Sequence, residues 1–182
     1  VEERLVTMRE KMEAIRRKEP DLIQRSENGR KGSELHGLVL WCDSDPNILS
    51  QCDVLRGSGL EVQHFQSPEA LLQQYLRAPK NVLCIMSSMM DGKGRQDPPV
   101  QADGGKLRQG MNAYDLLDLL PRAAEAKRCT KPLLVIISCS VDEAKAKTAG
   151  ADLVVKGNRI KAQNLIVTKL RKSLGLQAGY VG

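Results

Sequence analysis

Side chains that can bind ions stand directly after several short apolar runs of this 182-residue sequence. Asp43, Ser44 and Asp45 follow one run, Ser138 ends another, and Lys156 follows a third. Carboxylates are among the ligands that Mg²⁺ prefers in proteins, and a hydroxyl with a lysine can hold an anionic group. A site of this kind forms only if the fold brings the ends of these runs together.

No catalytic motif accompanies these residues. The sequence has no GxGxxG after its first apolar run, and no GxxxxGK[ST], GxSxG or HExxH. The histidines are His36 and His64, and neither is placed for a catalytic triad or shares a zinc-binding spacing with the cysteines. The sequence therefore predicts a protein that is not an enzyme and that holds no metal or cofactor.

Five short apolar runs alternate with five stretches of helical character. Strands are predicted at 38–42, 60–65, 82–86, 133–138 and 153–155, and helices at 45–56, 68–78, 112–127, 142–150 and 159–174. Continuously apolar strands are covered on both faces, which is typical of a parallel sheet. The predicted fold is α/β, a doubly wound, flavodoxin-like, five-stranded parallel sheet in the order 2-1-3-4-5. Ligands of such sheets bind beyond the carboxyl ends of the strands.

One domain is expected at residues 34–176, with a flexible Gly/Pro-rich insertion at 91–110 and a tail at 177–182. Residues 1–33 predict an N-terminal helix followed by a linker. The apolar residues of this helix have the spacing of a coiled-coil seam and are Val1, Leu5, Met8, Met12 and Ile15. The seam predicts either a homodimer or a helix that packs on its own domain. Because residue 1 is Val, the chain is expected to be part of a longer protein.

Basic residues outnumber acidic ones by 28 to 22, and the excess is local. No acid follows Asp152, whereas the same stretch contains the six cations Lys156, Arg159, Lys161, Lys169, Arg171 and Lys172. Such a stripe is either a solvated helix face or a surface for nucleic acid. Aromatic residues make up only 3% of the chain, which argues against base stacking. No apolar run approaches the roughly 18 residues of a membrane span.

The five cysteines are odd in number and lack CxxC spacing, which is typical of reduced thiols in a cytoplasmic or nuclear protein. We expect them to be buried and inert. An alternative is that Cys42, Cys84 and Cys139 converge at one edge of the sheet as a redox or soft-metal site.

The order of four motifs resembles the receiver domain of two-component response regulators. The motifs are WCDSDP, NVLCIMSSMMDG, the serine that ends VIIS, and AGADLVVKG. The resemblance covers about residues 38–174 apart from the insertion. It implies two acids after the first strand that hold Mg²⁺, an aspartate at the end of the third strand that accepts a phosphoryl group, and a hydroxyl and a lysine that bind this group.

Some positions of this sequence match that pattern. Asp43 matches the first acid, and Ser44 stands where the second belongs. Asp45 either belongs to the same degenerate pocket or is only a helix cap. Ser138 matches the hydroxyl and Lys156 the lysine, which we expect to pair with Asp43 across the site.

The phosphoacceptor is missing. The apolar strand pattern places Met86 at its position, whereas matching MMDG to the loop of the family places Cys84 there. Neither is a carboxylate, so neither can form an acyl phosphate. Gly157 and Leu153 replace a proline and an aromatic switch residue of the family. The resemblance implies a non-phosphorylatable pseudo-receiver, a signalling module of a larger sensor or regulator that acts through protein partners. The alternative is a nucleic-acid-binding module that uses the basic final helix.

Overall fold

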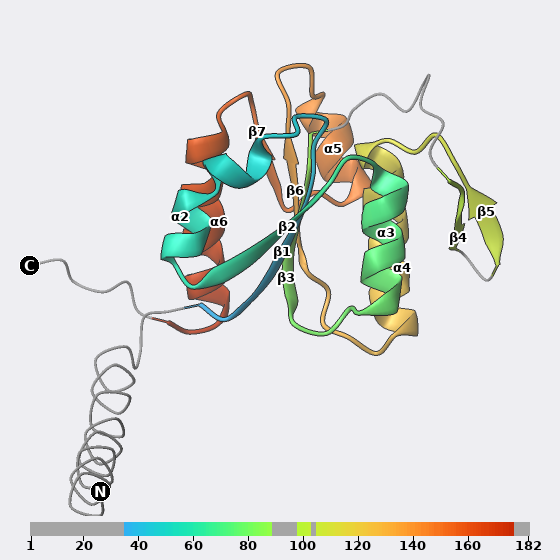
Figure 1. Cartoon of the computed structure of the whole chain (residues 1–182), viewed down its shortest axis with the longest axis horizontal. Coiled ribbons are helices and arrows are strands. Elements are labelled where there is room, and N and C mark those ends of the chain that lie inside the picture. The colour runs from blue at the N-terminus through green and yellow to red at the C-terminus, as the bar shows by residue number, and fades with distance from the viewer. Residues whose placement is uncertain (1–34, 89–97, 103–104, 177–182) are drawn as a thin grey trace, which may run out of the picture. The chain divides into compact units, whose positions relative to one another are not determined.

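The computed structural model describes residues 35–88, 98–102 and 105–176. Leu35–Gly175 form one compact unit. At its centre lies a parallel five-stranded sheet in the order β2-β1-β3-β6-β7 (Figure 1). Its strands are β1 (Gly37–Cys42), β2 (Leu60–Phe65), β3 (Val82–Ser87), β6 (Leu133–Ile137) and β7 (Leu153–Val155). Numbered within this sheet alone, the strands have the predicted order 2-1-3-4-5.

Helices cover both faces of the sheet (Figure 1). On one face, α2 (Asp53–Gly57) packs against α6 (Arg159–Ser173). On the other face, α4 (Ala113–Ala126) packs between α3 (Pro68–Arg77) and α5 (Glu143–Ala149). This coverage explains why the strands are continuously apolar, since every side chain of a central strand meets a helix layer.

The central strands show this burial directly. Val39, Leu40, Trp41 and Cys42 follow one another in β1 and all are buried. Successive side chains of a strand point to opposite faces, so both faces of β1 are inside the core. In the pairing of β1 with β3, Trp41 lies opposite Met86. The ends of these two strands therefore reach the same edge of the sheet.

Polar side chains begin three of the helices as the sequence predicted. The side chains of Ser67, Asn112 and Asp142 each accept a hydrogen bond from the backbone N–H three residues further on. Such a bond satisfies an N–H that has no partner within the helix. These caps fix where α3, α4 and α5 begin.

The prediction of one continuous helix at 45–56 was wrong. Its place is taken by a short 3-10 helix, η1 (Ile48–Gln51), and the separate α2. The N–H of Ile48 donates to the carbonyl of Asp45 at 3.4 Å, so Pro46 occupies the second position of a turn. Proline favours that position, and here it starts a turn instead of a continuous helix.

The insertion also contains structure that the sequence did not predict. β4 (Val100–Ala102) and β5 (Lys106–Arg108) form an antiparallel hairpin. Val100 is 5% exposed and belongs to the core, which anchors the hairpin to the domain. The predicted segments at 1–33 and 177–182 lie outside the described residues, as does part of the insertion. None of the helices in the described ranges is long and apolar enough to cross a membrane.

Candidate functional site

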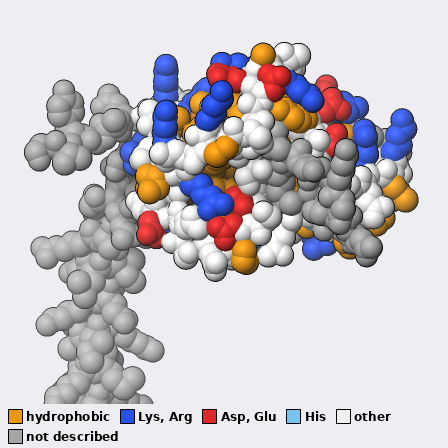
Figure 2. Space-filling model, turned by 90° about the horizontal axis from the view of Figure 1, so that it is seen from above, with side chains coloured by type: hydrophobic (Ala, Val, Ile, Leu, Met, Phe, Trp, Pro, Cys, Tyr) orange, Lys and Arg blue, Asp and Glu red, His pale blue; other side chains and the backbone are white. Residues whose placement is uncertain are grey.

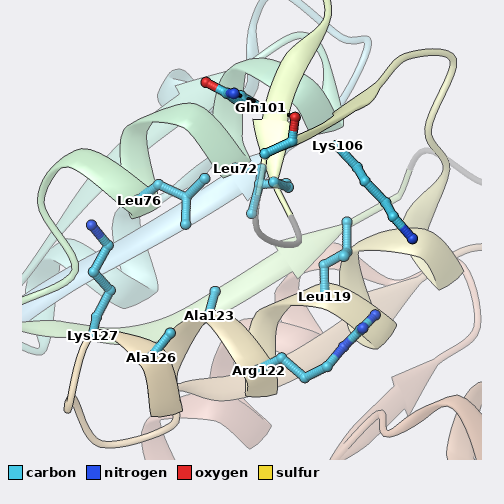
Figure 3. Close-up of a pocket in the computed structure, with 11 residues that line it drawn as sticks. Leu72, Leu76, Gln101, Lys106, Leu119, Arg122, Ala123, Ala126 and Lys127 are labelled. Atoms are coloured by element: carbon cyan, nitrogen blue, oxygen red, sulfur yellow. Dashed lines mark hydrogen bonds between the residues drawn. The ribbon is translucent and has the colours of Figure 1, made fainter.

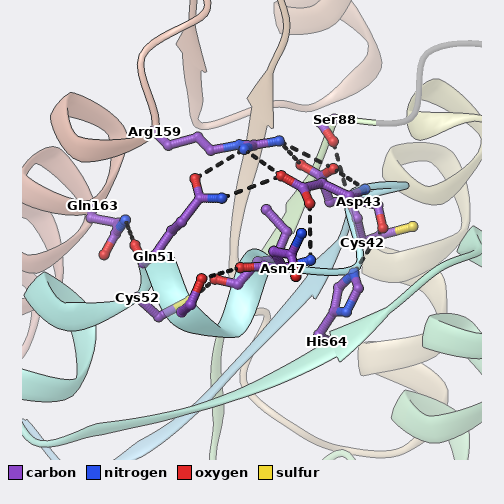
Figure 4. A network of polar contacts seen from close by, with 12 residues as sticks. Cys42, Asp43, Asn47, Gln51, Cys52, His64, Ser88, Arg159 and Gln163 are labelled. Atoms are coloured by element: carbon purple, nitrogen blue, oxygen red, sulfur yellow. Dashed lines mark hydrogen bonds and ion pairs between the residues drawn. The ribbon is translucent and has the colours of Figure 1, made fainter.

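A polar network lies at the carboxyl end of β1 (Figure 4). Arg159, the first residue of α6, donates from Nη2 to both carboxylate oxygens of Asp43, at 3.3 and 3.2 Å. Its Nη1 donates to Oδ2 of Asp45 at 2.9 Å. One guanidinium therefore pairs with two carboxylates that are 116 and 114 residues away in sequence and offsets one of their two negative charges. The Asp43 side chain is only 3% exposed, so this pairing is largely shielded from water.

Backbone hydrogen bonds hold the two carboxylates in place. Oδ1 of Asp43 accepts from the N–H of Asp45 at 2.8 Å, and Oδ1 of Asp45 accepts from the N–H of Asn47 at 2.9 Å. Nε2 of His64 lies 2.7 Å from the carbonyl oxygen of Asp43. The bond from Asn47 is the main cause that lowers the pKa of Asp45, and Arg159 adds to it. Asp45 is thus part of the network.

Two glutamines tie the network to the helices η1 and α6. Gln51 accepts from Nη1 of Arg159 at 3.0 Å and donates to Oδ2 of Asp45 at 3.2 Å. Gln163, which is fully buried in α6, donates to the carbonyl oxygen of Gln51 at 2.7 Å. Figure 4 shows Arg159, Gln51 and Asp43 facing one another. The guanidinium is therefore held by three side chains and has a defined position.

Strand β3 brings no carboxylate to this network. Cys84 and Met86, the two candidates for the acceptor position, are both fully buried in the sheet. The residue of this strand end that lines the hollow beside Asp43 is Ser88, whose N–H donates to the carbonyl of Cys42 at 3.0 Å. Ser88 stood among the residues that follow the third apolar run, but the spacing of the motif did not single it out.

The hollow beside Asp43 has a volume of about 450 Å³ and is lined on its far side by the ends of β6 and β7. Ser138 is one lining residue, and its hydroxyl lies 3.1 Å from that of Ser140. Gly157 is another and has a φ of 67°. A Cβ at Gly157 would lie 2.6 Å from Sγ of Cys139. Proline, which requires a φ near −65°, cannot take this conformation.

Lys156 does not line the hollow. It is exposed, and its charge contributes to lowering the pKa of Glu143 in α5, after the larger effect of Lys147. The expected ion pair between Lys156 and Asp43 was therefore wrong, because Arg159 takes that role. Ser44 is also exposed. A signal for Arg159 was present in the sequence, since the start of a helix that follows a strand lies at the carboxyl edge.

The cysteines do not form a cluster. Cys42 and Cys84 are buried, whereas Cys139 is exposed in the loop after β6. Burial raises the pKa of the Cys84 thiol, which disfavours the reactive thiolate. Within the described part of the chain, no three His, Cys, Asp or Glu side chains are grouped so that they could hold a metal ion. The alternative of a three-thiol site was wrong.

The donors at this edge do not suit Mg²⁺. A divalent cation requires several hard oxygen ligands, and the network offers the carboxylates of Asp43 and Asp45. Both are already paired with Arg159. Figure 2, which views the domain from above this edge, shows acidic and basic side chains next to one another on the face that is seen. The carboxylate oxygens of the network are therefore already paired with a side chain of the chain itself.

Comparisons with known proteins identify the fold. No protein-family model and no curated protein matches the chain. A response regulator structure from Chloroflexus aurantiacus matches with a TM-score of 0.52 and 18% identity, over 78% of this chain and 99% of that one. A receiver domain from Clostridium thermocellum matches with a TM-score of 0.52 and 16% identity, over 77% and 99% of the two chains.

The receiver domain of a histidine kinase from Syntrophus aciditrophicus is similar to the same degree. Its TM-score is 0.52 and its identity 13%, over 80% of this chain and 97% of that one. All three matches span nearly the whole of the matched domains. The chain therefore has the CheY-like fold of response-regulator receiver domains.

Proposed function

We propose that this chain is a pseudo-receiver, a signalling module that takes up no phosphoryl group and acts through protein–protein contacts. The observation that carries this proposal is the ion pairing of Arg159 with both Asp43 and Asp45. In a receiver that is phosphorylated, acids at this edge bind the divalent cation that the reaction requires. Here a guanidinium of the same chain pairs with both of them and offsets one of their two negative charges.

Displacing this guanidinium would be costly. Arg159 makes hydrogen bonds to Asp43, Asp45 and Gln51, all between 2.9 and 3.3 Å. An incoming Mg²⁺ must compete with a cation that is covalently part of the protein and already oriented. Charge-assisted hydrogen bonds of this kind are stronger than neutral ones. The resident cation therefore lowers the affinity of the acids for any added cation.

The end of β3 supports the same proposal. Ser88 offers a hydroxyl where acyl-phosphate chemistry needs a carboxylate. The Ser88 hydroxyl itself lies 3.4 Å from the carbonyl of Cys42, to which it donates. That carbonyl is not a base that could remove the hydroxyl proton. Phosphorylation of this serine by the receiver reaction is not expected.

The proposal is tested by incubating the full chain with acetyl phosphate and Mg²⁺ and measuring its intact mass. We expect no added phosphoryl group, while a phosphorylatable receiver treated in parallel gains one. Beryllofluoride with Mg²⁺ provides a second test. Trp41 is the single tryptophan of the chain, fully buried next to Cys42, so its fluorescence reports on the site.

We expect the Trp41 emission to stay unchanged on addition of beryllofluoride. A phosphoryl group mapped to the residues around the hollow, or a saturable change in emission that requires Mg²⁺, would overturn the proposal. The interaction role follows from the absence of this chemistry, and it implies protein partners that recognise a constitutive surface. The larger sensor or regulator that contains the module remains part of the proposal.

A further inference from the structure

A groove of the described domain lies on the helix layer opposite the one that carries Arg159. It has a volume of about 670 Å³ and is bounded by α3, α4 and the hairpin of the insertion. Figure 3 shows its lining residues, with those of α3 and the hairpin facing those of α4. The hairpin therefore forms one wall, and the insertion converts a helix pair into a groove.

The floor of the groove is an apolar strip that follows the axes of the two helices. Leu72 and Leu76 of α3 are four residues apart, and Leu119, Ala123 and Ala126 of α4 are spaced by four and three. These spacings place each set on one face of its helix. The alanines leave room that larger residues would fill, which accounts for the depth of the groove.

The rim of the groove is basic. Lys106, Arg122 and Lys127 line it, and none of the acidic side chains that the structure describes does. Lys127 lies at one end of the strip, while Lys106 and Arg122 lie toward the other (Figure 3). Arg122 is paired with Asp118 at 2.8 Å, whereas Lys106 and Lys127 are exposed. An occupant that is apolar in the middle and acidic on its flanks is complementary to this distribution.

We propose that this groove binds an acidic amphipathic helix of a partner protein. The inference rests on the proposed function, because it names the partner class of an interaction module. A helix suits the groove because its apolar residues recur every three or four positions, as do those of the strip. Leu107 of the hairpin is 68% exposed and adds apolar surface next to the groove.

The test is a titration of the ¹⁵N-labelled full chain with a designed peptide about four helical turns long. Leucines of the peptide recur at every third or fourth position, and glutamates stand between them. We expect saturable shifts of the backbone amides of Leu72, Leu76, Ala123 and Ala126. Affinity should fall as salt rises, because the flanking charges are exposed and therefore screened.

Two variants test the two features of the groove. Lys106→Glu with Lys127→Glu should weaken peptide binding about tenfold or more, since attraction at both ends becomes repulsion. Ala126→Trp should weaken it similarly by filling the strip. The matched control is Lys161→Glu with Lys172→Glu, which changes the net charge equally on exposed positions of α6 and should leave affinity within about twofold. A retained native spectrum shows that each variant is folded.

Three results would overturn the inference. The first is equal affinity for a peptide in which lysines replace the glutamates. The second is that the peptide shifts only backbone amides of α6. The third concerns the chain's own N-terminal seam. If Met8→Glu with Met12→Glu in the full chain moves the same groove amides, the seam is the occupant and no partner helix is needed.

The outcome separates this inference from the proposed function. If the chain takes up no phosphoryl group and binds no acidic peptide, only the inference about the groove is refuted. If the chain becomes phosphorylated but binds the peptide through the groove, the pseudo-receiver proposal is refuted and the docking site is supported.

Discussion

Arg159 shows how a side chain of the domain itself can pair with acids at the carboxyl edge of the sheet. Asp43 is 2% exposed, and burial of a carboxylate is unfavourable unless a partner compensates for its lost hydration. A bound metal ion can supply that compensation, and here a guanidinium does. Asp43 therefore has a structural role in this fold.

Replacing Arg159 with Ala should leave Asp43 buried without its cation. We expect the free energy of unfolding to fall by about 1–3 kcal/mol, less than for a wholly buried pair because Arg159 is 32% exposed. Mn²⁺ or Mg²⁺ should restore part of this loss in the variant and none in the wild type. Urea unfolding followed by Trp41 emission, with and without the ion, measures both effects.

Arg122→Ala is the control for this prediction, because Arg122 also pairs with an aspartate, Asp118, but on an exposed helix face. It should cost less than about 0.5 kcal/mol and show no response to divalent ions. Equal losses for the two arginine variants would contradict the structural role assigned to the Arg159 network.

Gly157 combines a left-handed conformation with a close approach. Its φ is 67°, and a Cβ would lie 2.6 Å from Sγ of Cys139. Gly175 has nearly the same φ, 68°, with nothing within 4 Å of a Cβ. The two glycines thus separate the cost of the conformation from the cost of the contact.

Gly175→Ala should destabilise the protein by about 1 kcal/mol, and Gly157→Ala by somewhat more, about 1–2 kcal/mol. Chemical denaturation of both variants measures the difference. In a Cys139→Ala background the two substitutions should cost the same. If the two substitutions lower the free energy of unfolding equally with Cys139 present, the thiol moves away from the new Cβ and the contact contributes nothing.

At the scale of elements, the sequence predicted the sheet well because its signals are local. Most strands are continuous apolar runs between turn residues, and four helices begin next to residues whose side chains accept hydrogen bonds from the backbone. Ser67 is one of these, accepting from Ala70 at 3.1 Å. Such interactions involve neighbours in sequence, so composition and spacing reveal them.

The misassigned elements depend on contacts that the sequence does not display. Asp45 followed by Pro46 is a common helix start, but the Asp45 carboxylate is engaged by Arg159 and Gln51, and η1 begins only at Ile48. The hairpin was missed because a glycine-rich stretch predicts a loop. Gly105, with a φ of 107°, supplies the turn that joins its two strands.

The candidate site could be predicted in part, because the strand order follows from local signals while the partner of Asp43 does not. The strand order places Asp43 and Ser138 at one edge, and both line the same hollow. The partner of Asp43 depends on which basic residue of the β7–α6 segment reaches across the edge. Lys156 and Arg159 are both near enough in sequence, and only the geometry of the turn at Gly157 selects between them.

Two of the basic residues of α6 are engaged by contacts within the domain. Arg159 is engaged by the acids, and Nζ of Lys169 donates to the carbonyl of Asp152 at 3.2 Å. We therefore expect only weak, non-specific binding of the full chain to duplex DNA, lost near physiological salt. Fluorescence anisotropy across a salt series measures it. Tight binding at physiological salt that Lys161→Glu with Lys172→Glu abolishes would favour the nucleic-acid alternative instead.

At the scale of the whole molecule, the domain completes its sheet and both helix layers with residues 35–175 alone. The seam of Val1, Leu5, Met8, Met12 and Ile15 is therefore additional apolar surface that the sheet does not need. Two heptads give little stability as an isolated helix, so the seam requires a partner surface. Two partner surfaces are compatible with the sequence, namely a second copy of the seam and the chain's own domain.

We predict the homodimer, because the seam has the alternating spacing that two like helices share. Static light scattering of the full chain should give the dimer mass at high concentration. Met8→Glu with Met12→Glu should give the monomer mass at every concentration, since four carboxylates cannot be buried at one short interface without partners. The domain should keep its unfolding midpoint in this variant. A wild-type chain that is monomeric throughout, with a midpoint that falls on the same substitution, would show that the seam instead packs on its own domain.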